Sequence, residues 1–294
     1  MATRQSIIIS GITGYLGSAL AHYFVGEGYK VIGLIRSKSS FERLKKINSS
    51  IKFYNTDSSK LKDIFNENDR VSAFIHTATS YGRNSESFTK IAHVNTFLPL
   101  CFLEQCCDAN VPLFINTGTS LKPNLNAYSV SKAHFVDWSK LFVKYNKIKF
   151  ININLEHFYG PNDQSYKFTT RVFNSCLKNE ESINLTIGTQ ERDFIYIDDV
   201  VTAYGLILQN AHNIATNFKE IDVGTGKVIT VRELVELIHN VTNSKSNLNF
   251  GAIPYRDGEI MYSKADTEYL KKIGWNCKFS IKDGIKRMFD LEKV

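Results

Sequence analysis

The stretch Ile7–Gly17, IIISGITGYLG, decides the fold of this 294-residue chain. A run of β-branched residues enters a glycine-rich turn, and helical periodicity follows from Gly14 onward. Gly11 permits a tight turn and Gly14 lets the backbone approach a pyrophosphate, which would sit on the helix N-terminus. Gly17 lets the helix lie close to the sheet. The spacing is GxxGxxG, and glycines are also common at ordinary turns, so the interpretation depends on the segments that follow.

Those segments alternate between apolar runs and helical periodicity. Pro99 lies inside one of the long helical candidates and should kink or split it. Near-continuous apolar strands alternating with helices predict an α/β fold with a doubly wound parallel sheet, a Rossmann domain. Strands are expected at Ser6–Ser10, Lys30–Ile35, Ile51–Tyr54, Val71–Ile75, Val111–Ile115 and Ile148–Leu155, and helices at Gly14–Val25, Phe41–Ile47, Glu86–Cys106 and Ala127–Tyr145.

The rhythm changes after Tyr159, where Gly160 and Pro161 mark a turn and shorter elements follow. This change predicts a second, smaller α+β domain interleaved with the first. We expect residues 1–158 and 188–224 to form the dinucleotide-binding domain. Residues 159–187 and 225–294 should form the substrate domain.

Composition and charge narrow the classes of function. The net charge is +7, spread along the chain without a basic block, which suits an anionic ligand and does not favour nucleic acid. No apolar run reaches about 18 residues, so no membrane span is expected. An odd number of cysteines, five, without a CxxC indicates reduced thiols and a cytoplasmic protein, and a strand from Ser6 leaves no room for a signal peptide. The seven histidines show no metal-binding spacing, so no metal is expected.

The end of the second strand indicates the choice of cofactor. Arg36 stands 19 residues past Gly17, where an NAD enzyme usually has an acid for the ribose 2′-hydroxyl. Arg36, with Ser37 and Lys38 behind it, suits a 2′-phosphate, which predicts NADP rather than NAD. A solvated basic helix start is the alternative. Asp57 could accept a hydrogen bond from the adenine amine, or simply cap the next helix.

A tyrosine and a lysine four residues apart, Tyr128 and Lys132, lie on one face of a predicted helix. A phenol titrates near 10, and a neighbouring ammonium together with an oxidised nicotinamide lowers that pKa. Hydroxyl residues follow the preceding strand at its carboxyl end, where ligands bind in such sheets. Thr119, with Ser120 as the second choice, is therefore the candidate to hold a carbonyl oxygen beside Tyr128. The alternative is a polar loop without a role.

The glycine turn, Thr119 and the Tyr128–Lys132 pair together resemble the extended short-chain dehydrogenases/reductases that act on nucleotide sugars. The resemblance covers essentially the whole chain. It implies that Lys132 anchors the nicotinamide ribose and that two arginines meet the diphosphate of the substrate. Further segments that match the family in order are Ile75–Thr79, Val94–Thr96, His157–Pro161, Arg192–Asp199 and Arg256–Glu259.

The motifs and the resemblance together define the expected site. The catalytic residues are Thr119, Tyr128 and Lys132. NADP should be bound by Gly11, Thr13, Gly14, Tyr15, Leu16, Gly17, Arg36, Ser37, Lys38, Asp57, Ser58, Thr77, Ala78, Thr79, Asn95, Thr117, Tyr128, Lys132 and His157. The nucleotide sugar should be bound by Tyr81, Arg83, Thr119, Ser120, Glu156, Lys167, Phe168, Arg192, Arg256 and Glu259.

A narrower resemblance is to the 4-ketoreductases of 3,6-dideoxyhexose biosynthesis. It implies NADPH-dependent reduction of the C4 ketone of a 4-keto-6-deoxy or 3,6-dideoxy nucleotide sugar, for bacterial surface polysaccharide (O-antigen). CDP is the expected nucleotide, and dTDP and GDP stay open. The matching stretches are Tyr81–Arg83, Gly118–Leu121, Leu155–Gly160, Lys167–Thr169, Glu259–Ser263 and Lys272–Trp275.

Departures from the family pattern favour a simple reductase. Dehydratases of this family carry an Asp-Glu pair after the catalytic threonine, whereas Ser120 and Leu121 stand here. Epimerases commonly have a longer segment between the catalytic hydroxyl residue and the tyrosine. Here Tyr128 stands only nine residues after Thr119. An epimerase that retains NAD and a catalytically silent dinucleotide sensor remain the alternatives. Two helices, Glu86–Cys106 and Ala127–Tyr145, carry apolar residues on more than one face and predict a homodimer, with a thicker monomer core as the alternative.

Overall fold

The computed structural model describes residues 5–68, 70–83 and 85–292 and divides into two compact units. The first unit contains Met1–Asn154 and Val201–Ile221, and the second contains Leu155–Val200 and Asp222–Val294. The sequence placed residues 188–224 in the dinucleotide domain. Residues 188–200 and 222–224 lie instead in the second unit, which also begins four residues earlier than expected.

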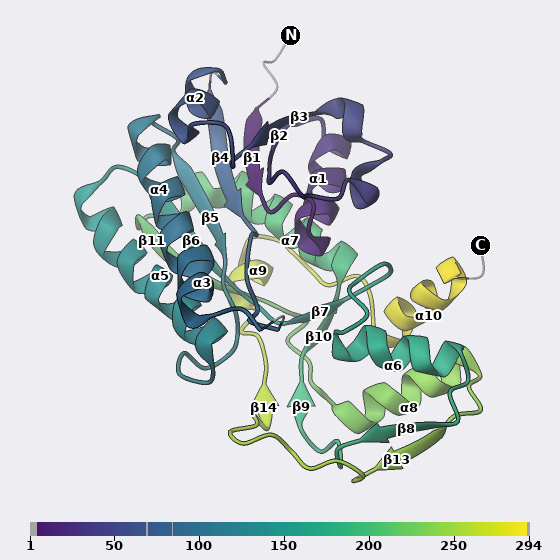
Figure 1. Ribbon diagram of the computed structural model, residues 1–294. Coiled ribbons are helices and arrows are strands. Elements are labelled where there is room, and N and C mark those ends of the chain that lie inside the picture. Colours follow the sequence, from purple (N-terminus) through teal and green to yellow (C-terminus); the bar gives the residue numbers. More distant parts are fainter. Residues whose placement is uncertain (1–4, 69, 84, 293–294) are drawn as a thin grey trace. The chain divides into compact units, whose positions relative to one another are not determined.

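A seven-stranded sheet forms the centre of the first unit, in the order β11-β6-β5-β4-β1-β2-β3 (Figure 1). The pairs that join β1 through β6 are all parallel. The doubly wound Rossmann sheet expected from the alternation is therefore confirmed. The strands are β1 (Ser6–Ser10), β2 (Lys30–Ile35), β3 (Ile51–Asn55), β4 (Val71–His76), β5 (Leu113–Thr117), β6 (Lys149–Leu155) and β11 (Phe218–Val223).

Stacked phenylalanines form a ladder across this sheet. Phe74, Phe114 and Phe150 lie on register partners of β4, β5 and β6, and neighbouring ring centroids are 5.0 and 5.4 Å apart. Phe218 of β11 extends the stack at 5.7 Å from Phe150. The Phe135 ring packs edge-on against the rings of Phe114 and Phe150. The ladder therefore forms the core beneath the helix to which Phe135 belongs.

Helices cover both faces of this sheet (Figure 1). Figure 1 shows α3, α4 and α5 on one face and α1 and α7 on the other. The helices α1 and α7 approach closely, because a Cβ at Gly205 would lie 2.4 Å from the Tyr23 hydroxyl oxygen. The helices of this unit are α1 (Tyr15–Gly26), α2 (Leu61–Asn66), α3 (Phe88–Ala92), α4 (Leu98–Asp108), α5 (Ala127–Tyr145) and α7 (Ile197–Asn210), with short turns η1 (Glu42–Leu44), η2 (Asn48–Ser50) and η4 (Ala211–Asn213).

The long helix expected at Glu86–Cys106 consists of α3, a π-helical segment (η3, His93–Phe97) and α4. Pro99 lies in the first turn of α4, where its missing N–H costs little. The irregular turn thus lies immediately before the proline. The amphipathic run predicted at Phe41–Ile47 forms only the 3-10 turn η1.

The second unit is built from short strands and helices. The strand β7 (His157–Tyr159) pairs parallel with β10 (Phe194–Tyr196), and β9 (Glu191–Arg192) lies between β12 and β14. Buried Asp193 connects loops here, since its carboxylate accepts the amides of Thr225, Gly226 and Ala265. The other elements are β8 (Ser182–Leu185), β12 (Ile229–Thr230), β13 (Asn247–Phe250), β14 (Tyr262–Ser263), α6 (Phe168–Leu177), α8 (Val231–Thr242), α9 (Glu268–Lys272) and α10 (Ile281–Glu292).

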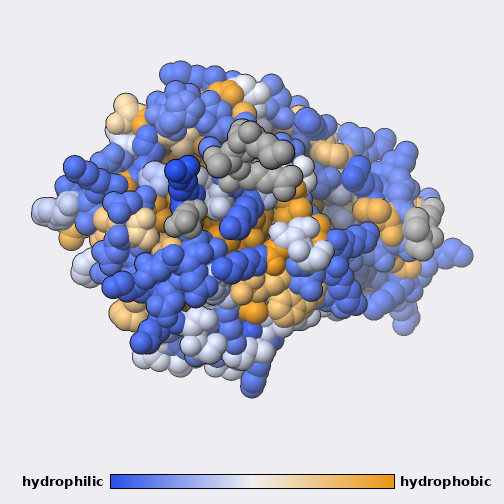
Figure 2. All heavy atoms as spheres, turned by 90° about the horizontal axis from the view of Figure 1, so that it is seen from above, coloured by the Kyte–Doolittle hydropathy of each residue, from blue (hydrophilic) through white to orange (hydrophobic). Residues whose placement is uncertain are grey.

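The face of the molecule drawn in Figure 2 is mainly hydrophilic. Figure 2 shows one face, on which apolar side chains occur in small groups between polar ones. Among the described residues, no helix combines the length and apolarity that crossing a membrane requires. The same residues contain no group of three or more metal-ligating side chains.

Candidate functional site

The glycine-rich turn lies between β1 and α1. Gly11 has a φ of +71°, and a Cβ on it would lie 2.6 Å from the amide nitrogen of Ala78. A Cβ on Gly17 would lie 2.3 Å from the Gly11 carbonyl oxygen, so the helix approaches the turn as only glycine allows. Gly14 caps α1 without a side chain, which leaves its N-terminus to an anion. Thr13, Tyr15 and Leu16 lie within this turn and the start of α1.

The turn after β2 is held by acceptors from neighbouring segments. The Ser37 amide donates to Asp57 Oδ2 at 2.8 Å, and Asn55 Nδ2 donates to Ser37 Oγ at 3.0 Å. Hydrogen bonds from Ser37, and then the charge of Arg36, hold the pKa of Asp57 below its usual value. Asp57 does not cap α2, whose N-cap residue is Lys60. The exposed residues predicted for the 2′-phosphate and adenine are Arg36, Ser37, Lys38, Asp57 and Ser58.

The end of β4 turns beside the glycine motif. Thr77 donates its hydroxyl to the carbonyl oxygen of Ser10 at 2.7 Å, which connects β4 to β1. Ala78 and Thr79 follow in the same turn. Asn95, predicted to contact the cofactor, is fully buried, and its amide is bonded to Ser80 and to Ser131 Oγ. Asn95 therefore holds this turn against α5 and does not present its amide to a ligand.

Lys132 lies one turn beyond Tyr128 on α5, as predicted, and is buried. Its Nζ donates to the carbonyl oxygen of Thr117 at 2.9 Å, at the carboxyl end of β5. Burial lowers the pKa of Lys132 to about 8. The ammonium is thus fixed at the edge of the sheet where ligands of such folds bind.

Tyr128 is hydrogen-bonded to Thr119, which brings two of the predicted catalytic residues together. The ring of Tyr81 lies 5.0 Å from that of Tyr128, and the Arg83 guanidinium lies over Tyr81 at 5.3 Å. Burial raises the pKa of Tyr128 to about 12, against smaller lowering effects of Thr119 and Arg83. The sequence predicted that the Lys132 ammonium and an oxidised nicotinamide together lower this pKa, and that stays a prediction. In the protein alone the phenol is protonated at neutral pH, as a proton donor must be. Ser120 follows Thr119 and is half-buried.

A row of buried polar residues crosses the central sheet of the first unit beside Lys132. Ser10, His76, Asn116 and Asn152 are register partners on β1, β4, β5 and β6. Ser10 Oγ and His76 Nδ1 are 2.7 Å apart, and Asn116 donates to Asn152 at 2.7 Å. Burial, and then the Lys132 charge, lower the pKa of His76 well below its usual value, so this row stays neutral.

Tyr204 of α7 is a site neighbour that the sequence analysis missed. Its hydroxyl lies 2.9 Å from Thr117 Oγ1, and Thr117 was itself predicted only as a cofactor contact. Burial raises the pKa of Tyr204, so the hydroxyl remains a neutral partner. No motif in the sequence indicates that a residue 87 positions from Thr117 contacts it.

In the second unit, Arg192 is buried and already paired. Its Nη2 lies 2.8 Å from Glu259 Oε1 and also donates to the Ile260 carbonyl oxygen, while Nη1 donates to the Glu191 carbonyl oxygen. The guanidinium was predicted to meet the substrate's diphosphate. In this structure it instead secures the segment that carries Glu259.

Arg256 differs from Arg192, because its side chain is exposed. Within the described part of the chain its guanidinium makes no hydrogen bond or ion pair. Lys167, predicted as a substrate contact, forms an ion pair with Asp163 at 3.1 Å, and its Nζ lies 4.1 Å from the Phe158 ring centroid. Phe168 follows at the start of α6. Among the predicted cations of this unit, Arg256 is thus the one presented to solvent.

Glu156 and His157 form a third pair in this unit. Glu156 is buried, with Oε2 at 3.2 Å from His157 Nδ1, and its Oε1 accepts the Ser263 hydroxyl at 2.7 Å. The carboxylate predicted to bind substrate is therefore engaged with two protein donors.

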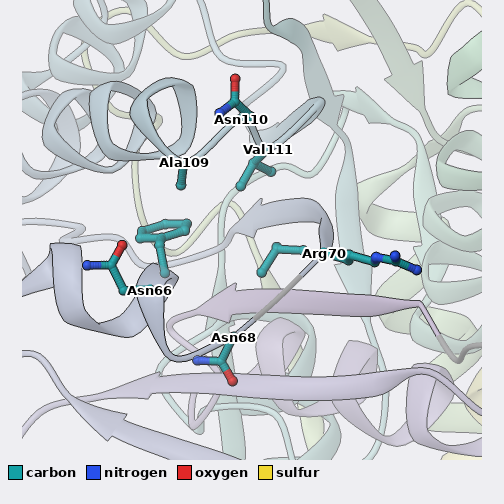
Figure 3. Close-up of a pocket in the computed structure, with 8 residues that line it drawn as sticks. Asn66, Asn68, Arg70, Ala109, Asn110 and Val111 are labelled. Atoms are coloured by element: carbon teal, nitrogen blue, oxygen red, sulfur yellow. The ribbon is translucent and has the colours of Figure 1, made fainter.

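A hollow of about 290 Å³ lies apart from all these residues (Figure 3). Val71 and Val111 in its lining stand at the start of β4 and just before β5, so it lies at the amino ends of these strands. Figure 3 shows the Arg70 side chain extending away from the other labelled residues. None of the predicted site residues lines this hollow.

Comparison with known proteins finds one family that matches along most of the chain. The model of the NAD dependent epimerase/dehydratase family matches residues 7–224. A CDP-abequose synthase from Salmonella muenchen is 36% identical over 297 residues, covering 99% of each chain. Another CDP-abequose synthase, from Salmonella typhimurium, is 30% identical over 296 residues and 97% of each chain.

Solved structures share the fold. UDP-glucose 4-epimerase from Thermotoga maritima, solved with UDP-glucose, gives a TM-score of 0.86 at 23% identity, over 98% of this chain and 99% of that one. The Thermus thermophilus UDP-glucose 4-epimerase, in complex with NAD, gives 0.82 at 20% identity, over 97% and 98%. The fold, the glycine turn and the full-length relatives agree, and the chain belongs to the NAD dependent epimerase/dehydratase family.

Proposed function

We propose that this protein reduces the C4 ketone of a CDP-linked 4-keto-6-deoxy or 3,6-dideoxy sugar with NADPH. The observation that carries the proposal is the placement of Tyr128 beside Thr119 and one helical turn from Lys132. The full-length similarity to two CDP-abequose synthases supports the nucleotide and the sugar class. The proposed setting is the cytoplasmic synthesis of a bacterial surface polysaccharide.

The glycine turn fits a nicotinamide dinucleotide, the cofactor class that the family's description indicates. The N-terminus of α1, which no side chain caps, offers positive charge for a pyrophosphate, and the absence of a Cβ at Gly11 lets the turn lie against Ala78. The preference for NADPH is supported by Arg36 and Lys38, which are exposed cations at the end of β2. When bound in reduced form, the cofactor supplies the hydride for the reduction.

The residues of α5 and the β5 edge perform the proton chemistry. Thr119 and Tyr128 donate hydrogen bonds to the ketone oxygen, which strengthen as negative charge develops there. Tyr128 then gives its proton to the alkoxide as a general acid. Lys132, fixed on the Thr117 carbonyl, keeps a positive charge at this edge and anchors the ribose of the nicotinamide.

Binding of the nucleotide diphosphate is proposed for the second unit. Arg256 is the available cation, because Arg192 is engaged with Glu259. A charge-assisted contact to a diphosphate orients the substrate from a part that does not react. Arg192 supports this function by holding the segment that follows Arg256.

We also propose a homodimer, formed through the outer faces of α4 and α5. Trp138 and Tyr145 are 52% and 80% exposed, and they lie in one group with other apolar side chains, as at many interaction surfaces. With Leu100, Leu141 and other residues of the two helices they line a hollow of about 190 Å³. The same face of a second subunit would cover these side chains as an isologous contact.

The test is to measure NADPH oxidation with CDP-, dTDP- and GDP-linked 4-keto-6-deoxy and 4-keto-3,6-dideoxy sugars. The proposal predicts stoichiometric oxidation and the highest kcat/KM with a CDP-linked substrate. An epimerase that retains its cofactor would interconvert sugar isomers without net NADPH consumption. A silent dinucleotide-binding protein would bind NADPH and turn over none of these substrates, and either result would contradict the proposal.

A further inference from the structure

A buried carboxylate in the second unit lies between two hydrogen-bond donors. Glu156 is 5% exposed, and its Oε1 accepts the Ser263 hydroxyl at 2.7 Å. Its Oε2 lies 3.2 Å from His157 Nδ1. A carboxylate has only acceptors, so the proton of this contact must reside on Nδ1.

The backbone around the imidazole is fixed as well. The His157 amide donates to the Asp193 carbonyl oxygen at 3.2 Å, and His157 is the register partner of Phe194 between β7 and β10. The Phe194 ring packs edge-on against the imidazole at 5.8 Å. Main chain, aromatic contact and carboxylate therefore fix the position and the orientation of the ring.

The other ring nitrogen is left for a ligand. No described residue bonds to His157 Nε2, and the His157 side chain is 36% exposed. With Nδ1 protonated, the neutral ring carries a lone pair on Nε2, which accepts a proton or a hydrogen bond. A hydroxyl group is the complementary donor, and a nucleotide sugar carries several.

We propose that Glu156 is a positioning residue, which fixes the Nδ1–H tautomer of His157 so that Nε2 accepts a hydrogen bond from a sugar hydroxyl. This inference rests on the proposed function for the identity of the substrate. It changes two sequence-based assignments, because Glu156 acts through His157 and His157 contacts the sugar rather than the cofactor. Carboxylate–imidazole pairs orient histidines in this way in many enzyme sites.

The tautomer can be tested without substrate. Long-range proton–nitrogen correlation spectra of protein with 15N-labelled histidine distinguish the two neutral tautomers, and His157→Asn identifies the signal of His157. At a pH where the ring is neutral, the wild-type protein should show His157 as the Nδ1–H tautomer. A wild-type His157 in the Nε2–H form would overturn the inference, whatever reaction the protein catalyses.

Steady-state kinetics test whether Glu156 acts on the substrate through His157. Glu156→Gln keeps the side-chain volume and should raise KM for the nucleotide sugar on the order of tenfold, the effect of one misaligned hydrogen bond, with little change in KM for NADPH. His157→Gln should raise the same KM to a similar extent. The double variant should have the same KM for the nucleotide sugar as His157→Gln alone, because Glu156 acts on the substrate only through His157.

The control is Glu236→Gln, an exposed glutamate of α8 in the same unit, which should leave both KM values unchanged. Additive costs in the double variant would show that Glu156 touches the substrate itself and would overturn its positioning role. A rise in KM for NADPH, with KM for the nucleotide sugar unchanged, would show that His157 contacts the cofactor and not the sugar. Circular dichroism melts of each variant separate these outcomes from loss of folding.

Discussion

The ammonium of Lys132 is bonded to the main-chain oxygen of Thr117 at 2.9 Å, and the Thr117 hydroxyl lies 2.9 Å from that of Tyr204. Lys132 is thus held on the end of β5, one helical turn beyond Tyr128, whose pKa burial raises to about 12. The phenol is a protonated acid at neutral pH, which suits the reductive direction of the proposed reaction.

The first prediction concerns pH. Burial lowers the pKa of Lys132 to about 8, so its charge is present below that pH and lost above it. We expect kcat/KM for ketone reduction to fall as the pH rises through about 8. Arginine stays charged throughout, so Lys132→Arg should abolish this fall, at a lower overall rate. A wild-type profile flat from pH 7 to 9.5 would contradict the role of the charge.

The second prediction concerns stability. The folded state lowers the pKa of Lys132 from 10.5 to about 8, which costs about 3 kcal/mol while the residue is charged. This cost is full below pH 8 and fades as the pH rises to about 10.5, where the unfolded chain also loses the proton. Removing the ammonium loses the bond to Thr117, worth about 1–2 kcal/mol.

Lys132→Met should therefore raise the free energy of unfolding at pH 7 by about 1 kcal/mol, while reducing kcat and weakening NADPH binding. Urea unfolding at pH 7 and pH 10 measures this, and the gain should disappear at pH 10. A loss of stability at pH 7 would show that the fold depends on the ammonium.

The helices and strands around the site could be predicted from the sequence. Several side-chain contacts between residues far apart in the chain could not. Helix α5 runs over the predicted range Ala127–Tyr145, because its periodicity agrees with the cap that Asn126 forms at its first turn. The pairing of Arg192 with Glu259 joins residues 67 positions apart, and no periodicity reports such a contact. Asn95 matched a family segment, but whether its amide faces a ligand or a buried turn depends on three-dimensional packing.

The third prediction concerns the proton donor. Tyr128→Phe removes only the phenolic hydroxyl and should lower kcat by about 10²- to 10⁴-fold with NADPH binding intact. Thr119→Val should cost less, about 1–3 kcal/mol of transition-state stabilisation, because one donor to the oxygen is lost. Steady-state kinetics and fluorescence titration with NADPH measure both effects.

The matched control for Tyr128→Phe is Tyr145→Phe, since Tyr145 is 80% exposed at the end of the same helix. It should retain full turnover. Near-normal turnover of Tyr128→Phe itself would assign the proton to another group.

The fourth prediction concerns the cofactor. Arg36→Ala should reduce the preference for NADPH over NADH by about ten- to a hundredfold, the value of a charge-assisted contact to the 2′-phosphate. Asp57→Asn should raise that preference, because the Asp57 carboxylate bonds the Ser37 amide and lies near Arg36. Measuring kcat/KM for both cofactors in the three proteins checks this. Equal use of NADH and NADPH by the wild type would rule out a role of Arg36 in this choice.

The fifth prediction concerns assembly. Light scattering at micromolar protein should give twice the chain mass of 33.4 kDa. Trp138→Glu places a charge on the exposed face of α5 and should shift the mass toward the monomer, since burying an unpaired charge is costly. A wild-type mass of one chain would reject the dimer.

The most direct test of the ketoreductase assignment follows the transferred atom. The protein is incubated with a CDP-linked 4-keto-6-deoxy sugar and NADPH that is deuterated at both C4 positions of the nicotinamide. The product is analysed by mass spectrometry and NMR. One deuterium at C4 of the sugar for each NADPH consumed is the expected result. Unlabelled product, or sugar isomers formed without loss of NADPH, would contradict the assignment.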